Sequence, residues 1–281
     1  MIEILTDSTC DLPQPLLERY AITVLPHIII WGSEQFRDRV NLQPVDFYQR
    51  LQSDPRLPTT SAIPEIEFVT AYQAAQARGA SEVIAVMINA HFSGAYQNAL
   101  AAAAQVDLPV QVVEPHTTTM GLGLLVLAAA RMRDAGAGST EILARLAEIR
   151  QRLILYVCLD SLEFVEKGGR IGKASRLVGT LLQIKPILDV NARSGEVVDI
   201  ATTRTHKHAV DEFYRHFFCA VAPHRPFRVA VSHGNAPEDA NGLIERIRRE
   251  YQPLEILTNI TGPVLGIHTG PRALALAGYN E

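Results

Sequence analysis

The sequence has few cysteines, and none of them form a CxxC pair. Cys10, Cys158 and Cys219 lie far apart among 281 residues. We therefore expect neither a disulfide framework nor a zinc site, and a reducing cytoplasmic location. Cys158 falls within the apolar run at residues 153–159 and is predicted to pack as a small hydrophobic side chain.

Long apolar runs and a strong charge of one sign are also missing. No run reaches the roughly 18 apolar residues of a membrane-spanning helix, so no membrane span is expected. The N-terminus, MIEILTDSTCDLP, has no basic region before its apolar stretch, unlike a signal peptide. Lys and Arg total 26 against 30 Asp and Glu, which gives a net charge of −4. A slightly acidic chain is a poor candidate for a nucleic-acid binder, so no nucleic-acid partner is predicted.

Motifs for nucleotides and metals are absent or incomplete. The segment KGGRIGK at 167–173 begins with lysine where a P-loop needs glycine. The GLG at 121–123 lacks the third glycine of a dinucleotide fingerprint. His206, His208 and Asp211 resemble a metal cluster, but they open a polar helix and are interpreted as solvated surface residues. We therefore predict no catalytic residue, no metal and no cofactor in this chain.

What the sequence does contain is an alternation of short strand-like runs with longer Ala- and Leu-rich segments. Strands are predicted at residues 2–5, 23–30, 83–88 and 110–113. Helices are predicted at 65–78, 94–105, 121–135 and 140–152. This alternation predicts a parallel sheet covered by helices on both faces.

The second half keeps strands but changes their order. Strands are predicted at 154–159, 186–190, 196–201, 228–233 and 254–259, and helices at 206–219 and 237–251. Ser194-Gly195 is typical of a turn and predicts an antiparallel hairpin. We therefore predict a two-domain α/β protein: residues 1–155 form a parallel Rossmann-like domain, residues 156–281 form a domain with a mixed sheet, and a ligand lies between them.

Four polar clusters fall where a strand ends or a helix begins: residues 59–65, 89–96, 168–171 and 268–271. Ligands bind at such ends in open α/β sheets. Hydroxyls at a helix start can cap the helix or hold an anion, and for residues 59–65 alone capping is the favoured interpretation. Ser93-Gly94 leaves the same two alternatives open. Arg170 is either a surface charge or an anion clamp.

The ordered set of motifs resembles the DegV family from end to end. The motifs are TDST at 6–9, Thr60-Ser61 with Pro64, Ser93-Gly94 with Tyr96, KGGRI at 167–171, IKPIL at 184–188 with Gly195, Arg204, and HTGP at 268–271. Two motifs depart from the pattern. Ala62 follows Thr60-Ser61 where glutamine is common, and Ala95 follows Ser93-Gly94 where threonine is common.

The resemblance implies a protein that binds one long-chain fatty acid in a buried tunnel. It further implies that the chain is the fatty-acid-binding subunit of a bacterial fatty acid kinase. Such a subunit presents the carboxylate to a separate ATP-using kinase, which forms an acyl phosphate for phospholipid synthesis. The residues that this would assign to the carboxylate are Thr60, Ser61, Ser93, Gly94 and His268, and those at the pocket mouth facing the partner are Arg170 and Arg204.

A fatty acid also needs an apolar wall, because each buried methylene is worth about 0.8 kcal/mol. Candidates for this wall are Leu122, Leu124, Leu125, Ile154, Val157, Leu181, Leu182 and Ile184.

Two other functions stay open. One is a lipid hydrolase or acyl transferase that uses Ser93 and His268 with Asp7. The other is a nucleotide- or sugar-phosphate-binding protein that uses residues 168–170.

Overall fold

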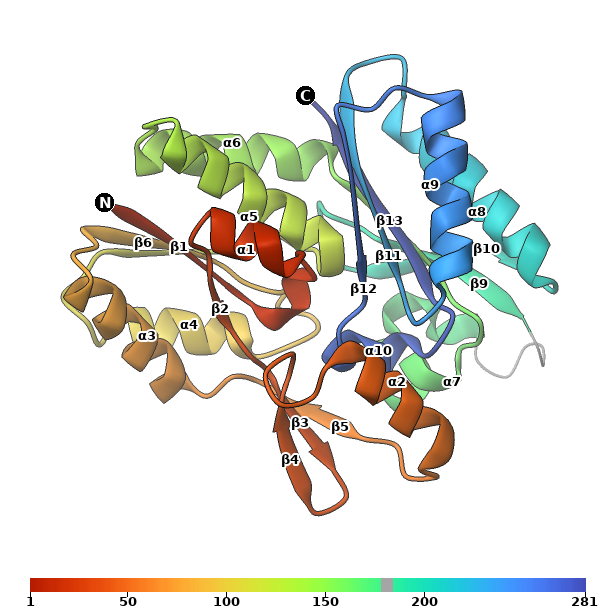
Figure 1. The fold of residues 1–281 in the computed structure, drawn as a ribbon, viewed down its shortest axis with the longest axis horizontal. Helices are drawn as coiled ribbons and strands as arrows, with labels where there is room; N and C mark the ends of the chain where they lie inside the picture. Colours follow the sequence, from red (N-terminus) through yellow and green to blue (C-terminus); the bar gives the residue numbers. More distant parts are fainter. Residues whose placement is uncertain (178–183) are drawn as a thin grey trace.

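The computed structural model describes residues 1–177 and 184–281 of the chain. Two larger β-sheets and their helices form successive layers, and a small third sheet lies to one side (Figure 1). The predicted α/β class is confirmed, because one large sheet is wholly parallel and the other is mixed.

The parallel sheet comes from the first part of the chain and has the strand order β2-β1-β6-β7. Its strands are β1 (Ile2–Asp7), β2 (Thr23–Leu25), β6 (Glu82–Val86) and β7 (Val110–Val113). One face is covered by α3 (Glu65–Ala77) and α4 (Ala95–Ala103) (Figure 1). The short η1 (Ser8–Cys10) and α1 (Gln14–Arg19) follow β1.

The mixed sheet comes from the second part and has the order β10-β9-β8-β13-β11-β12. Its strands are β8 (Ile154–Cys158), β9 (Lys185–Val190), β10 (Val197–Thr203), β11 (Phe227–His233), β12 (Glu255–Ile260) and β13 (Leu274–Asn280). The predicted antiparallel hairpin is confirmed as β9–β10, and Gly195 in its turn has a φ of 75°. The predicted domain boundary at residue 155 falls inside β8 and stays a prediction.

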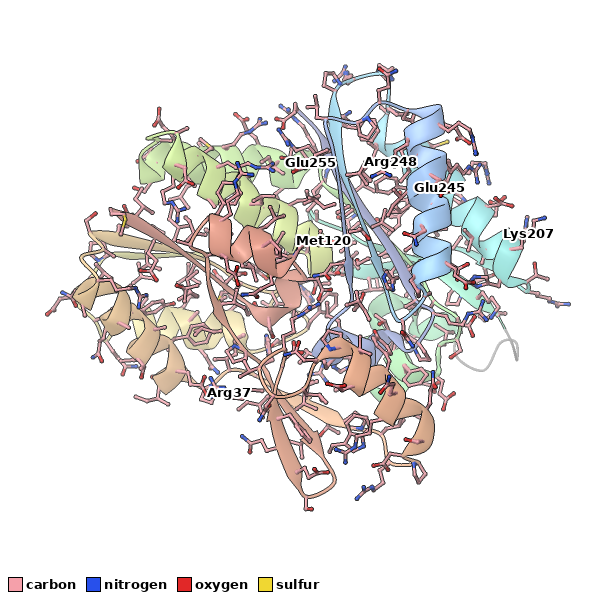
Figure 2. The ribbon with its side chains drawn as sticks, viewed as in Figure 1. Arg37, Met120, Lys207, Glu245, Arg248 and Glu255 are labelled. Carbon is pink, nitrogen blue, oxygen red and sulfur yellow. The ribbon has the colours of Figure 1, made fainter. Side chains whose placement is uncertain are left out.

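Two helices, α8 (His206–Val221) and α9 (Pro237–Glu250), cover the outer face of the mixed sheet (Figure 1). The sequence of α9 explains how it packs, because its buried residues recur at helical spacing. Leu243, Ile244 and Ile247 face the sheet, whereas Glu245 and Arg248 are exposed. Figure 2 labels the last two side chains on α9.

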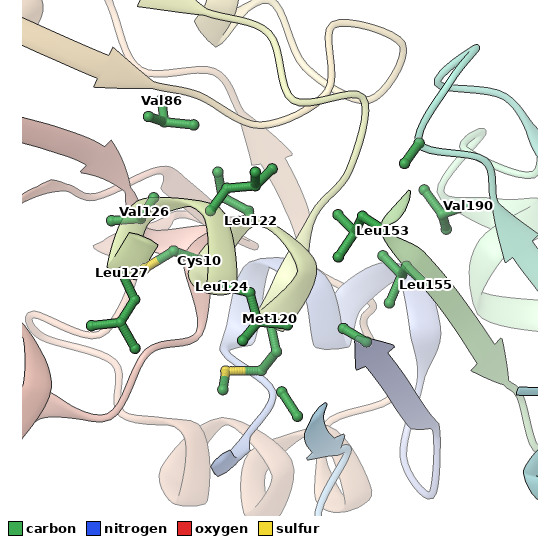
Figure 3. Packing of buried hydrophobic residues seen from close by; sticks show 14 of the residues in the cluster. Cys10, Val86, Met120, Leu122, Leu124, Val126, Leu127, Leu153, Leu155 and Val190 are labelled. Atoms are coloured by element: carbon green, nitrogen blue, oxygen red, sulfur yellow. The ribbon is translucent and has the colours of Figure 1, made fainter. Parts of the chain in front are cut away.

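Two further helices, α5 (Thr119–Asp134) and α6 (Ser139–Arg152), lie between the two large sheets (Figure 1). α5 packs on β1 and β6 on one side and on β11 and β13 on the other. Residues 119–127, 129 and 130 of α5 are buried on all sides of the helix, as expected for a segment covered on every face, and only its last turn is polar. Figure 3 shows Met120 and Leu122 of α5 in one cluster with Val86 and Leu155, which come from the two sheets.

The small sheet, with the order β4-β3-β5, was not predicted. It consists of β3 (Ile28–Trp31), β4 (Glu34–Arg37) and β5 (Thr59–Ser61). The single strand predicted at residues 23–30 is therefore wrong, because the chain leaves the parallel sheet after β2 and enters the small sheet at β3. Pro26 lacks the N–H that a continuous strand would need there, and the His27 N–H donates to Ser8 Oγ at 3.2 Å.

Among the remaining short elements, the last helix of the chain packs onto this small sheet. These elements are α2 (Pro44–Ser53), α7 (Glu163–Lys167), η2 (Gly172–Leu177) and α10 (Pro263–Thr269). α10 packs on α2, α7, β3 and β5. Its start is anchored by Asp11, whose carboxylate accepts the Gly262 N–H at 2.9 Å and pairs with Arg39 at 2.6 Å. Residues more than 200 positions apart thus meet at one site.

Candidate functional site

A cavity lies where the small sheet, the mixed sheet and the loop before α4 meet, and about 850 Å³ there is free of protein atoms, part of it open to solvent. Its walls are mostly apolar. The polar side chains that line it include those of His27, Thr60, Ser61, Ser93, Arg170 and His268. The predicted site residues Thr60, Ser61, Ser93, Gly94, Arg170 and His268 are therefore all brought to one cavity.

Thr60 and Ser61 lie in β5, where they pair with Ile29 and Ile28 of β3. The interpretation of this segment as a helix cap is wrong, because α3 begins at Glu65 after Pro64 and has no side-chain cap. The Thr60 hydroxyl lies instead 3.1 Å from the imidazole Nε2 of His268.

Ser93 and Gly94 directly precede α4, and Gly94 is the N-cap residue of that helix. The Ser93 Oγ accepts a hydrogen bond from the Ala95 N–H at 3.2 Å, which fixes the side chain at the helix start. Within the described residues, the hydroxyl proton of Ser93 has no acceptor, so it is available to a ligand in the cavity. A Cβ on Gly94 would meet only Ala62, at 4.0 Å, so close packing does not require this glycine.

His268, near the end of α10, is a neutral imidazole at pH 7. Burial lowers its pKa to about 4, and the positive charges of Arg170 and His27 act in the same direction. Its Nδ1 has no hydrogen-bond partner among the described residues. We therefore assign the ring proton to Nε2, which donates to the Thr60 oxygen and leaves the Thr60 O–H to face the cavity.

Gly168 is the residue that makes room for this imidazole. A Cβ at position 168 would lie 2.1 Å from His268 Nδ1, which no side-chain carbon can do. Glycine permits close approach to the backbone, and Gly168 is used in this way. The group that packs closely against Gly168 is the His268 ring of the same chain and not a ligand.

Arg170 lies at the cavity mouth and is exposed to solvent. Its Nε donates to the Phe92 carbonyl at 3.1 Å, and its Nη1 donates to the Gly168 carbonyl at 2.8 Å. The side chain thereby links the loop before α4 to the segment after α7. Arg204 does not line the cavity; it is exposed in the bend between β10 and α8. Its predicted role facing a partner stays a prediction.

The apolar wall differs from the one expected. Of the candidates, Val157 lines the cavity, whereas Leu122, Leu124 and Leu125 pack in the core because α5 is covered on both sides. Ile154 and Ile184 lie away from the cavity, and residues 181 and 182 fall outside the described part. The wall is formed largely by the β8–β10 sheet face and α7, through Val157, Leu159, Val165, Leu188, Val190 and Val197.

Sequence reasoning missed His27. It is 2% exposed and lines the cavity, and its Nε2 lies 3.4 Å from the Asp7 Oδ1. A histidine after a proline inside an apolar run was the available signal. Burial opposes ionisation of both side chains, but their mutual hydrogen bond and charge attraction keep the Asp7 pKa below and the His27 pKa above its ordinary value.

The catalytic triad considered from the sequence is not assembled. Asp7 pairs with His27 rather than His268, and His268 Nε2 contacts Thr60 rather than Ser93.

His206, considered as a metal ligand, lies 3.0 Å from Asp239. In the described ranges, no three His, Cys, Asp or Glu side chains are grouped to hold a metal ion. No helix among the described residues combines the length and apolarity needed to cross a membrane.

Comparisons with known proteins agree with this fold. A family model described as "Uncharacterised protein, DegV family" matches residues 1–281. Protein DegV from Bacillus subtilis (strain 168) is 30% identical over 277 residues, which cover 98% of each chain.

Two solved structures match over nearly their whole lengths. DegV from Bacillus subtilis, described as a fatty acid binding protein, has a TM-score of 0.90 at 28% identity and covers 100% of this chain and 99% of that chain. A DegV family protein from Thermus thermophilus, described by its fatty acid binding, has a TM-score of 0.92 at 29% identity, with the same coverage. With the family model matching every residue, the chain belongs to the DegV family.

Proposed function

We propose that the protein binds one long-chain fatty acid, with the carboxylate at the polar end of the cavity and the tail along its apolar wall. The observation that carries this proposal is the meeting of Thr60, Ser93 and His268, from three distant segments, in a single mostly apolar cavity. The fatty acid binding described for the Bacillus subtilis and Thermus thermophilus proteins supports it.

The polar end suits a carboxylate that must later react. Burying a carboxylate costs several kcal/mol unless donors replace its water. Hydroxyl protons of Thr60, Ser61 and Ser93, with the Gly94 amide nearby, would supply those donors. Hydroxyls hold the head group without a bidentate salt bridge, so one carboxylate oxygen stays nucleophilic.

The tail supplies most of the binding energy. At about 0.8 kcal/mol per methylene, burial of most of a sixteen-carbon tail contributes on the order of 10 kcal/mol before the costs of association. The Val- and Leu-rich surface of β8, β9 and β10 offers that environment.

The chain is, on this proposal, a cytoplasmic carrier subunit that contributes no catalytic residue and needs no cofactor. A separate fatty acid kinase would dock at the mouth, where Arg170 carries positive charge suited to ATP or the acyl phosphate. Arg204, in the bend between β10 and α8, would face the same partner from outside the cavity. Its product would enter phospholipid synthesis. The incomplete P-loop pattern at residues 167–173 supports assigning the ATP chemistry to a partner.

Mass spectrometry of the lipid released from the denatured protein tests the ligand, and a fatty acid is expected. Titration tests the site: Ser93→Ala should weaken fatty acid binding while the thermal unfolding midpoint of the ligand-free protein stays close to wild type. Unchanged affinity would refute the role of Ser93. Turnover of a chromogenic acyl ester that disappears in Ser93→Ala would instead support a hydrolase or acyl transferase.

A further inference from the structure

His27 is placed so that its ring forms part of the cavity wall beside the Thr60-Ser61 strand. It lies at the end of the 26–27 break between β2 and β3, and the next residue, Ile28, pairs with Ser61. The backbone of His27 is fixed by the Ser8 hydroxyl. Its side chain is 2% exposed, so the ring is held by the protein rather than by solvent.

Asp7, behind this ring, is held as a carboxylate. It is fully buried at the end of β1. Its oxygens accept hydrogen bonds from the Ile88 N–H at 2.7 Å, the Thr9 N–H at 2.9 Å and the Thr9 hydroxyl at 2.5 Å. Three donors favour the charged form of a buried carboxyl group.

The neighbours of His27 favour the protonated ring. Burial opposes its charge, but Asp7, Asp38 and the Ser61 carbonyl outweigh burial and raise the pKa of His27. Two arginines lie near the polar end of the cavity. Arg39 pairs with Asp11, and Arg170 donates to two carbonyls at the mouth. His268 faces the same cavity as a neutral ring.

The ion pair of Asp7 and His27 is oriented relative to the cavity. His27 lines the cavity and Asp7 does not. The positive end of the pair therefore faces the space where a head group would lie, and the negative end faces the interior.

We propose that His27 is a further head-group residue of the cavity, whose positive charge, balanced by Asp7, makes the site select an ionised carboxylate over a neutral polar head group. This inference rests on the proposed function and deepens it. Hydroxyl donors can bind both a carboxylate and a fatty alcohol, because both offer oxygen acceptors. A buried cation adds discrimination, since its charge attracts the ionised head group and not the neutral one.

The test compares two ligands of equal length on the full, delipidated chain: palmitate and hexadecan-1-ol, at neutral pH. The variant is His27→Gln, which keeps a hydrogen-bonding side chain without the charge, and the matched control is the exposed His224→Gln. We expect His27→Gln to weaken palmitate binding by about ten-fold or more and to change hexadecanol binding by no more than about two-fold. The control should change neither.

Equal weakening of both ligands by His27→Gln would overturn the inference, as would unchanged palmitate affinity. If the wild-type chain binds neither ligand, the proposed function itself fails, which is a different result. Should His27→Gln not fold, NMR titration of the wild-type His27 ring decides. Palmitate should raise its pKa and hexadecanol should not, whereas the same pKa with and without palmitate overturns the inference.

Discussion

The imidazole Nε2 of His268 lies 3.1 Å from the hydroxyl oxygen of Thr60, although the two residues are 208 positions apart. This contact joins the last helix of the chain, α10, to the edge strand β5 of the small sheet. Each side chain thereby sets the orientation of the other. Because the imidazole is neutral, the pair presents a hydroxyl proton rather than a charge to the cavity.

Removing this hydroxyl should weaken fatty acid binding more than it weakens the fold. Thr60→Val keeps the branched shape but removes the donor, so we expect roughly ten-fold weaker palmitate binding, the value of one hydrogen bond to a charged group. Thr60→Ser should restore most of the affinity. Isothermal titration of both variants gives the comparison.

The control for Thr60 is its neighbour Thr59, which is exposed, lies on the same strand and does not line the cavity. Thr59→Val should bind palmitate like the wild type. If Thr59→Val and Thr60→Val lose affinity equally, the effect comes from the strand and not from the hydroxyl.

Adding one methyl group at Gly168 should displace His268. The new Cβ would lie 2.1 Å from Nδ1, so the ring must move and its contact with Thr60 must lengthen. We expect Gly168→Ala to cost about 1–3 kcal/mol in the free energy of unfolding, as overpacking does, and to weaken palmitate binding. Urea unfolding and titration measure the two effects.

The same substitution at a matched glycine, Gly242, should raise the free energy of unfolding instead of lowering it. Gly242 lies in α9, and a Cβ there would meet nothing within 4 Å. Gly242→Ala should therefore stabilise the protein by up to about 1 kcal/mol through helix propensity, without any change in palmitate affinity. A Gly168→Ala variant as stable as the wild type would contradict the close packing inferred at His268.

Many of the strands could be predicted because period and composition are local signals. Residues 83–88 and 110–113 are short, Val- and Ile-rich runs, and they form β6 and β7. The turn at Ser194-Gly195 predicted the β9–β10 hairpin. The break at Pro26 was missed because an apolar run on both sides of a proline resembles one strand until its hydrogen-bond partners are known.

The candidate site was predictable where a motif carried it and not where packing alone did. Thr60, Ser93 and His268 were found through a family resemblance, and the structure brings them to one cavity. The leucines of α5 were expected at the tail wall, but two sheets cover that helix and use them as core. His27 was missed because its charge depends on Asp7, which is 20 positions away along the chain and adjacent only in the fold.

The depressed pKa of His268 predicts how stability depends on pH. Its ordinary pKa of 6.5 falls to about 4 in the folded protein. Between these values the unfolded chain binds more protons than the folded one, so stability falls as the pH is lowered from 6.5 to 4. The contribution is fully present above pH 6.5 and amounts to on the order of 3 kcal/mol. Asp38 has the opposite effect in part of this range, because burial raises its pKa to about 6.

The experiment therefore compares wild type with His268→Gln, since Asp38 is the same in both and cancels in the difference. Urea unfolding at steps from pH 7 to pH 4 should show that wild type loses more stability on acidification than the variant. The exposed His224→Gln should keep the wild-type slope. Parallel pH profiles for wild type and His268→Gln would mean that the His268 ring keeps its ordinary pKa. It would then be partly charged near neutral pH, and the assignment of a neutral donor pair with Thr60 would fail.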